Sequence, residues 1–502
     1  MALRSPFPAA LLALALCACS ANAVPDGSEI QARAVFNVRD FGAVGNGRAD
    51  DSAAIQKALT AAEAHQGGTV FFPAGVYSIV PAEGILFVAS NITFAGVGRR
   101  SVIRVADGAG EYNLIFGQRP GRVRNVVFRD LRFDQNPSGN PSGINFTTNI
   151  ENVIQLYSFE RLTIDRVAFD PEPGVQTVVA AGRDHPAGLE IANCFFRFMR
   201  ARSAYPYYDE STVYTESAHA HIFDNVFQTT NEQNAITALE LHGGPDIVVE
   251  RNRIVQFQTG MNLVNSTLGY PNVRATRFLV RDNDFRGVAI GVDLWSITGR
   301  TYRDTTIEHN SFEFSQHILY HDTWLGIEFQ PGGRSQGLGG DFEGIAVDGN
   351  RFDFSPLHRQ RIATLSSAAF HLAPDSEIRL FTARNNDLID PPSSGIQIGK
   401  TAVANRFNGI TFERNRIQAA GWDPRAPSDD RSAVVLGPAS MNEVHVNSTI
   451  IVAPALRQGV FSFIAEPARG SRDVTLDHDH VIPPKVLAHR VSSIVQTEGT
   501  TF

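Results

Sequence analysis

The sequence contains little cysteine, little lysine and no long apolar segment after its first residues. Of its three cysteines, Cys17 and Cys19 lie in the leader, so Cys194 alone remains and the folded part cannot form an intramolecular disulfide. Three of the 44 basic residues are lysines, at positions 57, 400 and 485, which leaves few candidates for a lysine base. No later stretch reaches about 18 apolar residues, so any membrane attachment must come from a lipid.

Acidic residues outnumber basic ones, 52 against 44, and the formal net charge is −8. This balance gives no reason to expect nucleic acid as a partner, because surfaces that bind nucleic acid are basic. With 43% hydrophobic residues, 42 glycines and 34 phenylalanines, the chain can bury a large core, which excludes a disordered protein.

The first 23 residues have the form of an export signal. Arg4 precedes an apolar run from about residue 9 to residue 18, which is too short to span a membrane. Residues 21–23 offer a site for signal-peptide cleavage, whereas residues 16–19 resemble a bacterial lipoprotein box in which Cys19 would be acylated. We therefore expect an exported bacterial protein, either an outer-membrane lipoprotein or a periplasmic or secreted form.

A short pattern recurs along most of the remaining chain: apolar, any, apolar, two mostly polar, Asn, any, apolar. Earlier copies have Leu131, Val167 and Cys194 at the Asn position, where we expect Cys194 to be a buried, inert thiol. Such units cannot close a core singly, whereas stacked coils bury a continuous one. We interpret the asparagines as structural, in turns that need a left-handed residue and with side chains bonded along the stack. They are Asn225, Asn252, Asn283, Asn310, Asn350, Asn386 and Asn415.

Residues 37–59 predict the start of this stack. Glycines at positions 42, 45 and 47 permit tight turns, Asp50, Asp51 and Ser52 supply oxygens for a helix N-terminus, and residues 53–64 form a short helix that would cap the first coil. Asp50 and Asp51 have the form of a catalytic acid pair, but beside a capping helix we interpret them as structural.

This segment, NVRDFGAVGNGRADDSAAIQKAL, is followed by GGTVFFPAGVYSI and ITFAGVGRRSVI. Together they resemble the N-terminal signature of the pectate lyase superfamily, in particular its rhamnogalacturonase and epimerase-like group. The resemblance implies an all-β fold, a right-handed parallel β-helix (solenoid) with a short N-terminal capping helix. We expect a linker at residues 24–35, a single β-helix domain at 36–465 with its cap and first coils in 36–110, and a C-terminal cap or tail at 466–502.

A second set of strands, between those that carry the asparagines, holds the candidate chemistry. Each has a middle residue flanked by two apolar residues, as in Leu239-Glu240-Leu241. Alternate strand residues face opposite sides, so the flanks face the core and the middle residues form one outward column. The predicted column is Gln155, Ala180, Tyr214, Glu240, Asn262, Asp293, Glu328, His371 and Gln397, with His242 and Trp295 two positions further on.

Three carboxylates of this column would lie within about 10–15 Å, because coils stack at about 4.8 Å. Asp293 and Glu328 are the nearest pair. When two carboxyl groups lie this close, the charge of one raises the pKa of the other, so one stays protonated while the other is ionised. Glycosidic cleavage uses such a pair, with one residue as acid and the other as base or nucleophile. We predict that Asp293, Glu328 and Glu240 are catalytic. The alternatives are a Glu240–Asp293 pair and an ordinary polar surface.

The other polar side chains near the column are candidates for substrate binding, because histidines bind hydroxyls or orient carboxylates and aromatic rings stack on sugars. Residues 477–480 alternate Asp and His, but no second cluster of metal ligands lies nearby in the sequence, so we expect no metal site. The binding candidates are His371, His242, Trp295, Asn262, Tyr214 and Gln397.

These observations predict an exported enzyme that hydrolyses glycosidic bonds of a polysaccharide and needs no cofactor. Carboxylates repel a strongly anionic polymer, which favours a neutral or weakly acidic glycan as partner. The Asn-Thr-Asp, Asp-Asp, Gly-His-Gly and Arg-Ile-Lys motifs of polygalacturonases do not occur in that order. The first alternative is a polysaccharide lyase acting on uronic acids, with Tyr214 or His371 as base and Ca²⁺ as cofactor. The second is a non-catalytic surface solenoid that binds glycans.

Overall fold

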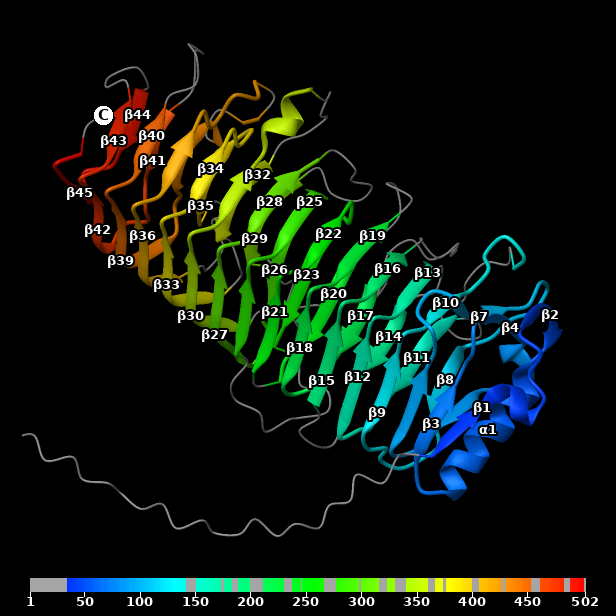
Figure 1. Cartoon of the computed structure of the whole chain (residues 1–502). Helices are drawn as coiled ribbons and strands as arrows, with labels where there is room; N and C mark the ends of the chain where they lie inside the picture. Colours follow the sequence, from blue (N-terminus) through cyan, green and yellow to red (C-terminus); the bar gives the residue numbers. More distant parts are fainter. Residues whose placement is uncertain are drawn as a thin grey trace, which may run out of the picture. The chain divides into compact units, whose positions relative to one another are not determined.

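Short strands of the chain pair in parallel into three long sheets in the computed structural model (Figure 1). The first sheet contains, in order, β1 (Val35–Asn37), β3 (Gly68–Phe71), β6 (Ile92–Ala95), β9 (Val126–Arg129), β12 (Arg161–Asp165), β15 (Gly188–Ala192), β18 (Ala220–Phe223), β21 (Ile247–Glu250), β24 (Phe278–Arg281), β27 (Thr301–Glu308), β30 (Asp341–Asp348), β33 (Glu377–Arg384), β36 (Arg406–Glu413), β39 (Ser440–Asn447), β42 (Arg472–Asp477) and β45 (Val495–Glu498).

The second and third sheets are built in the same way. The second contains β2 (Asn46–Asp50), β4 (Gly75–Ile79), β7 (Ser101–Val105), β10 (Arg132–Asp134), β13 (Ala168–Glu172), β16 (Phe195–Phe198), β19 (Val226–Thr229), β22 (Arg253–Val255), β25 (Asp284–Val288), β28 (Ser311–Phe314), β31 (Arg351–Asp353), β34 (Asp387–Ile389), β37 (Arg416–Gln418), β40 (Ile450–Val452) and β43 (His480–Ile482). The third contains β5 (Leu86–Val88), β8 (Leu114–Gln118), β11 (Asn152–Leu156), β14 (Gln176–Ala180), β17 (Ser211–Thr215), β20 (Thr237–His242), β23 (Thr259–Val264), β26 (Ile290–Trp295), β29 (Thr323–Phe329), β32 (Ser366–Leu372), β35 (Ser394–Ile398), β38 (Ser432–Leu436), β41 (Phe461–Ala465) and β44 (Ala488–Val491).

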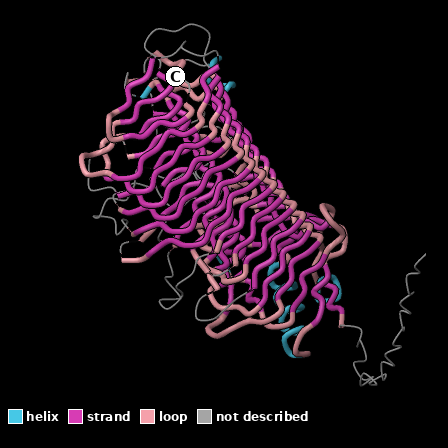
Figure 2. Tube along the Cα trace, turned by 90° about the vertical axis from the view of Figure 1, so that its left-hand side faces the viewer, coloured by secondary structure: helices cyan, strands magenta, loops and turns pink. Residues whose placement is uncertain are grey.

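From β3 onward, neighbours within each sheet are three strands apart along the chain, so each complete coil gives one strand to each sheet; the first coil, with β1 and β2, gives none to the third. This is the predicted right-handed parallel β-helix, and Figure 2 shows the strands of successive coils running side by side. The structure describes residues 34–140, 150–172, 176–182, 188–198, 211–229, 237–244, 246–265, 277–297, 299–315, 323–329, 340–359, 366–372, 376–399, 406–424, 426–427, 430–452, 461–482 and 488–500. The predicted export signal, the linker up to residue 33 and Cys19 therefore lie outside the described residues.

The core is a column of apolar side chains that repeats from coil to coil. In the second sheet Phe169, Phe196 and Phe227 stack with ring centroids 4.7 Å apart at each step. Phe312 stacks in the same way between Phe285 and Phe352, at 4.5 and 4.9 Å. Each fully buried ring contributes roughly 1.5–3 kcal/mol through burial alone, so the core grows in proportion to the number of coils.

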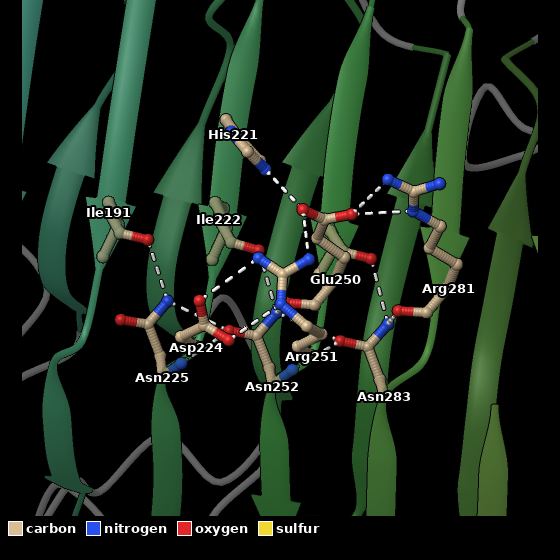
Figure 3. Close-up of polar contacts among 11 residues, drawn as sticks. Ile191, His221, Ile222, Asp224, Asn225, Glu250, Arg251, Asn252, Arg281 and Asn283 are labelled. Atoms are coloured by element: carbon tan, nitrogen blue, oxygen red, sulfur yellow. Dashed lines mark hydrogen bonds and ion pairs between the residues drawn. The ribbon is translucent and has the colours of Figure 1, made fainter.

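The recurring asparagines form a buried ladder, as the sequence predicted (Figure 3). The Asn283 amide donates to Asn310 Oδ1 and to the Val249 carbonyl, both at 2.9 Å, and its backbone N–H also donates to Asn310 Oδ1 at 2.9 Å. The left-handed residue of each turn, however, is the one before the asparagine, with φ of 54° at Asp282 and 55° at His309. The left-handed residue turns the chain so that the next side chain points inward. The asparagine that recurs in each coil therefore lies one position after the residue with positive φ.

Cys194 occupies a position of this ladder and is buried, with its N–H donating to Asn225 Oδ1 at 2.8 Å. Burial raises the pKa of its thiol to about 12, so the thiolate needed for nucleophilic attack is not formed at neutral pH. The interpretation of Cys194 as an inert core residue is consistent with both observations.

The helix α1 (Ser52–Ala64) covers the first coil with Ile55, Leu59 and neighbouring alanines. Asp51 is buried but does not cap this helix, contrary to our expectation. Its carboxylate accepts from the backbone N–H of Val44 at 2.6 Å and of Ser78 at 3.2 Å, so it ties the glycine-rich turn to β4. Among the described residues, the other helices are short 3₁₀ turns at Val38–Phe41, Pro81–Glu83 and Ser355–Arg359.

The coils continue beyond residue 465, where the sequence predicted a cap or tail. β42, β43, β44 and β45 extend all three sheets, because the repeat persists there with Thr449 and Asp479 in place of Asn. Thr449 N–H donates to Asp479 Oδ1 at 2.7 Å, so the ladder is maintained by a carboxyl group. None of the helices in the described part of the chain has both the length and the apolar character needed to cross a membrane.

Candidate active site

The outward face of the third sheet carries the candidate column in strand register. Tyr214, Glu240, Asn262, Asp293, Glu328, His371 and Gln397 are successive Cα partners in β17, β20, β23, β26, β29, β32 and β35. One position differs from the prediction: Gln155 pairs with Val179, so Val179 faces outward and Ala180 faces the core. Residues 178–181 are all apolar, so they do not distinguish the core face from the outward face, which explains the error.

Asp293 and Glu328 are adjacent carboxylates on neighbouring strands, with 4% and 8% of each residue exposed. Burial raises the pKa of Asp293 to about 7. Burial, together with the negative charge of Asp293, raises the pKa of Glu328 well above its ordinary value. Because a negative charge on Asp293 opposes ionisation of Glu328, the pair favours a state with one protonated and one ionised carboxyl group, which acid and base catalysis by two carboxyl groups requires.

His371 follows Glu328 on the next strand, and its Nδ1 lies 3.9 Å from Glu328 Oε1. This distance is too long for a hydrogen bond but allows electrostatic stabilisation of an ionised Glu328 by a protonated imidazole. Trp295 is half-buried two residues after Asp293 on the same strand and pairs with Val264. The structure therefore places a histidine beside Glu328 and an indole two residues after Asp293.

A second polar cluster lies three and four strands before Glu328 along the sheet, on β20 and at the end of β17, and includes a residue that the sequence did not reveal. Glu216 is 1% exposed and accepts from the Tyr214 hydroxyl at 2.6 Å. Glu240 Oε1 is bonded to His242 Nε2 at 2.8 Å, and the rings of Tyr214 and His242 are 4.7 Å apart. The spacing of Glu216 from Tyr214 equals that of His242 from Glu240, which is the signal in the sequence that could have identified it.

Asn262 lies between the two groups, paired with Glu240 on one side and Asp293 on the other. Its Oδ1 and the Nδ1 of His242 are buried atoms with no hydrogen-bond partner among the described residues. Buried polar atoms without a partner cost about 1–3 kcal/mol, so these two are available to bind a ligand. Gln397 is less suited to this role, because it is 1% exposed and its amide lies 3.4 Å from Asp430 Oδ1.

Several other residues capable of binding a sugar or a metal do not contribute to this face. Trp324 is buried and its indole donates to the Ser315 carbonyl at 2.8 Å. Lys400 lies outside the described residues. Asp479 belongs to the ladder, and no cluster of three or more metal-ligating side chains occurs in the described part of the chain.

A charged network centred on Glu250 lies on the first sheet, not on the candidate face (Figure 3). Glu250 accepts from His221 Nε2 at 3.1 Å, from Arg251 at 2.6 Å and from Arg281 at 2.6 Å. Although burial opposes ionisation, these donors lower the pKa of Glu250 to about 2. A carboxylate whose lone pairs are already bonded to fixed cations cannot exchange protons with a substrate near neutral pH, so we assign this network a structural role.

Comparison with known proteins gives relatives over part of the chain. Mannuronan C5-epimerase AlgE6 of Azotobacter vinelandii is 33% identical over 174 residues, which are 31% of this chain and 20% of that protein. Alginate lyase 7 of the same organism is 31% identical over 173 residues, covering 30% of this chain and 19% of the lyase. The chain thus covers about a fifth of the length of either relative.

Similarity in three dimensions extends over most of the chain. A tailspike protein of Escherichia coli bacteriophage HK620 superposes with a TM-score of 0.59 and 15% sequence identity, covering 85% of this chain and 78% of the tailspike. At this identity the likeness concerns the fold. The family model described as rhamnogalacturonase A/epimerase, pectate lyase-like, matches residues 35–311, more than half of the sequence. The chain therefore belongs to the rhamnogalacturonase A/epimerase group of pectate lyase-like proteins.

Proposed function

We propose that this protein is an exported carbohydrate-active enzyme that hydrolyses glycosidic bonds of a polysaccharide on the outward face of its third sheet. The observation that carries the proposal is the in-register, buried pair of Asp293 and Glu328 with raised pKa values. The relatives support a polysaccharide as substrate: two are named for mannuronan and alginate, and the HK620 tailspike has been solved with a pentasaccharide.

In the proposed mechanism Glu328 is the acid and Asp293 the nucleophile or base. The pKa of Glu328 is raised further by the charge of Asp293, so Glu328 keeps its proton and donates it to the leaving glycosidic oxygen. Asp293, whose pKa is about 7, is ionised above neutral pH. Neighbouring strands are about 4.8 Å apart, close to the roughly 5–5.5 Å between the carboxyl groups of retaining glycosidases, which favours direct attack by Asp293 over activation of water.

Residues beside the pair would bind and orient the sugar. His371 lies near enough to Glu328 to stabilise its carboxylate after proton transfer. Asn262 Oδ1 and His242 Nδ1 offer polar atoms to sugar hydroxyls, and Glu240 holds His242 through the bond to its Nε2. Trp295 offers an indole ring for stacking on the apolar face of a sugar.

A second candidate function is β-elimination or epimerisation of a uronic acid polymer. The cluster of Tyr214, Glu216, Glu240 and His242 favours it, because a tyrosine and a histidine, each bonded to a carboxylate, can remove and deliver protons. In this reaction Ca²⁺ would neutralise the uronate carboxylate. Activity lost on chelation and restored by Ca²⁺ would support this candidate over hydrolysis.

The two reactions are separated by their products. The purified full chain is incubated with mannuronan, polygalacturonate, rhamnogalacturonan and neutral glycans while reducing ends and the ultraviolet absorbance of unsaturated uronates are recorded. Hydrolysis produces reducing ends without absorbance, elimination produces both, and epimerisation produces neither but changes the proton NMR spectrum of the polymer.

Variants then test the site. Asp293→Asn and Glu328→Gln should each lower kcat by at least about a hundredfold, as expected for loss of a general acid or base. Glu308→Gln on β27 removes a carboxylate from the first sheet and serves as the matched control. Full activity of both site variants, with binding retained, would refute the catalytic assignment and favour a glycan-binding solenoid.

Export is part of the same proposal. Acylation at Cys19 would leave the protein bound to a membrane through lipid, whereas cleavage after residue 23 would release it. Metabolic labelling with a fatty acid, in the parent and in a Cys19→Ala variant, distinguishes the two routes. Label in the parent alone supports the lipoprotein.

A further inference from the structure

A cavity of about 630 Å³ lies between two turns that connect the third sheet to the first, in the early coils of the helix. One turn joins β8 to β9 and contributes Arg119, Arg122 and Arg124. The other joins β11 to β12 and contributes Tyr157 and Ser158. Neither turn contains a residue that the candidate active site uses.

The two turns are fixed to each other. The Gln118 amide donates to the Gly121 carbonyl at 2.6 Å and to the Ser158 carbonyl at 3.1 Å, and Gln118 Oε1 accepts from the Ser158 N–H at 3.1 Å. Backbone bonds between Val123 and the neighbouring turn, at 2.9 and 3.1 Å, add to this connection. The backbone of the two turns is therefore preorganised, so a ligand would not bear the entropic cost of ordering it.

Three arginine side chains line the cavity, and Arg122 differs from the other two in its contacts. Arg119 is paired with Glu63 at 3.0 Å and lies over the Phe87 ring, and Arg124 is paired with Glu160 at 2.9 Å. Arg122 is exposed and makes no hydrogen bond or ion pair within the described part of the chain. A guanidinium presents parallel donors that match a carboxylate, so Arg122 is suited to a carboxylate-bearing ligand.

Tyr157 connects the cavity to the face that carries the candidate active site. Its hydroxyl is bonded to the amide of Gln155, which is the column residue two positions earlier, so both side chains lie on the same side of the sheet. Tyr157 is 45% exposed, so part of its side chain is accessible to a sugar. Five strand spacings separate β11 from β26, which corresponds to about 24 Å along the third sheet.

We propose that this cavity is a distal binding subsite for an anionic sugar unit, a uronate, in a polysaccharide chain whose cleaved bond lies at Asp293 and Glu328. The inference rests on the proposed function. Arg122 would bind the sugar carboxylate and Tyr157 would stack on the ring. The anionic unit is held about 24 Å from the carboxylate pair, so it avoids the repulsion that a uronate beside Asp293 would meet.

Binding without turnover provides the test. Calorimetric titration of the full chain carrying Asp293→Asn uses an oligomannuronate and a neutral mannan oligosaccharide of equal length, which differ in the sugar carboxylate. Adding Arg122→Gln should weaken oligomannuronate binding by about tenfold, because the variant loses one charge-assisted hydrogen-bonded pair. The affinity for the neutral oligosaccharide should not change. Tyr157→Ala should weaken both ligands by roughly threefold to tenfold through lost stacking.

Arg48→Gln on β2 is the matched control, because Arg48 is an exposed arginine of the second sheet. Unchanged oligomannuronate affinity in the Arg122→Gln variant, or an equal loss in the Arg48→Gln control, would overturn the subsite. In the cleaving parent, Arg122→Gln should raise KM for long polymers and leave kcat, and KM for a disaccharide substrate, unchanged. Loss of cleavage in Asp293→Asn bears on the proposed function alone, so failure of either proposal is recognisable separately.

Discussion

The raised pKa of the buried Asp293 carboxyl group should affect the stability of the protein as well as catalysis. Its pKa is raised from an ordinary value of 3.8 to about 7 because the group is buried. The folded protein therefore binds a proton that the unfolded chain releases between these two values. The stabilisation from this proton is fully present below pH 3.8 and is lost as the pH rises through about 7.

The magnitude follows from the size of the rise. One pKa unit corresponds to about 1.4 kcal/mol at 25 °C, so the parent loses about 4 kcal/mol from this group between pH 4 and pH 8. Asp293→Asn keeps the shape of the side chain and removes the ionisation. We expect the variant to exceed the parent in free energy of unfolding by up to about 4 kcal/mol at pH 8, and to equal it near pH 4.

Urea unfolding followed by circular dichroism at pH 4, 6 and 8 measures this difference. Glu250→Gln is the control of opposite sign, because the pKa of Glu250 is lowered to about 2 by its arginine and histidine partners. The stabilisation that ionised Glu250 gives the parent is present above pH 4.5 and is lost as the pH falls through about 2. The Glu250→Gln variant should therefore have a lower free energy of unfolding than the parent at pH 8, and the difference should shrink as the pH falls. An Asp293→Asn variant that is no more stable than the parent at pH 8, or equally more stable at pH 4, would refute the reasoning.

Three further predictions concern other parts of the molecule. The hydrolysis rate should rise with pH to half of its maximum near pH 7, as Asp293 ionises, and fall at alkaline pH as Glu328 loses its proton; a pH profile of kcat checks both limbs. Asn283→Ala should lower the free energy of unfolding by about 3 kcal/mol, because the buried Asn252 N–H, 2.9 Å from Asn283 Oδ1, loses its acceptor; a ladder that tolerates the change would appear as an unchanged urea midpoint. Asp479→Asn should protect the amides of the last coil from hydrogen exchange above pH 8 and have little effect at pH 6, because burial raises the pKa of Asp479 to about 8 and the carboxyl group stabilises the coil until it ionises.

The coil architecture was predictable because its causes are local. The spacing of the asparagines and the flanking apolar residues fixed the repeat, and each ladder bond joins equivalent positions of neighbouring coils. Two details were not predictable in this way. The left-handed backbone at Asp282 precedes the motif residue, and nothing in a polar side chain at that position distinguishes it from an ordinary turn residue. The register at Ala180 was wrong because residues 178–181 are all apolar and do not distinguish the two faces of the strand.

The sequence predicted which residues of the candidate site lie in one column, but not how deeply each is buried or which partners it has. Alternation within strands placed Asp293 beside Glu328, and the strand pairing agrees. Burial depends on all neighbouring coils, so the sequence could not reveal that both carboxyl groups have raised pKa values while Glu250 has a lowered one. Glu216 was missed because its importance comes from the Tyr214 hydroxyl, a contact that only the folded strands create.

By itself the sequence determined a stack of parallel coils, an asparagine ladder and an outward row of polar residues, because each follows from a short pattern repeated along the chain. Tertiary structure decided which polar residues are desolvated, which are bonded to fixed partners, and how the turns at Arg122 and Tyr157 meet around a cavity. These properties depend on the dielectric environment and on contacts between residues more than thirty positions apart, such as Gln118 and Ser158, and a local pattern does not encode them.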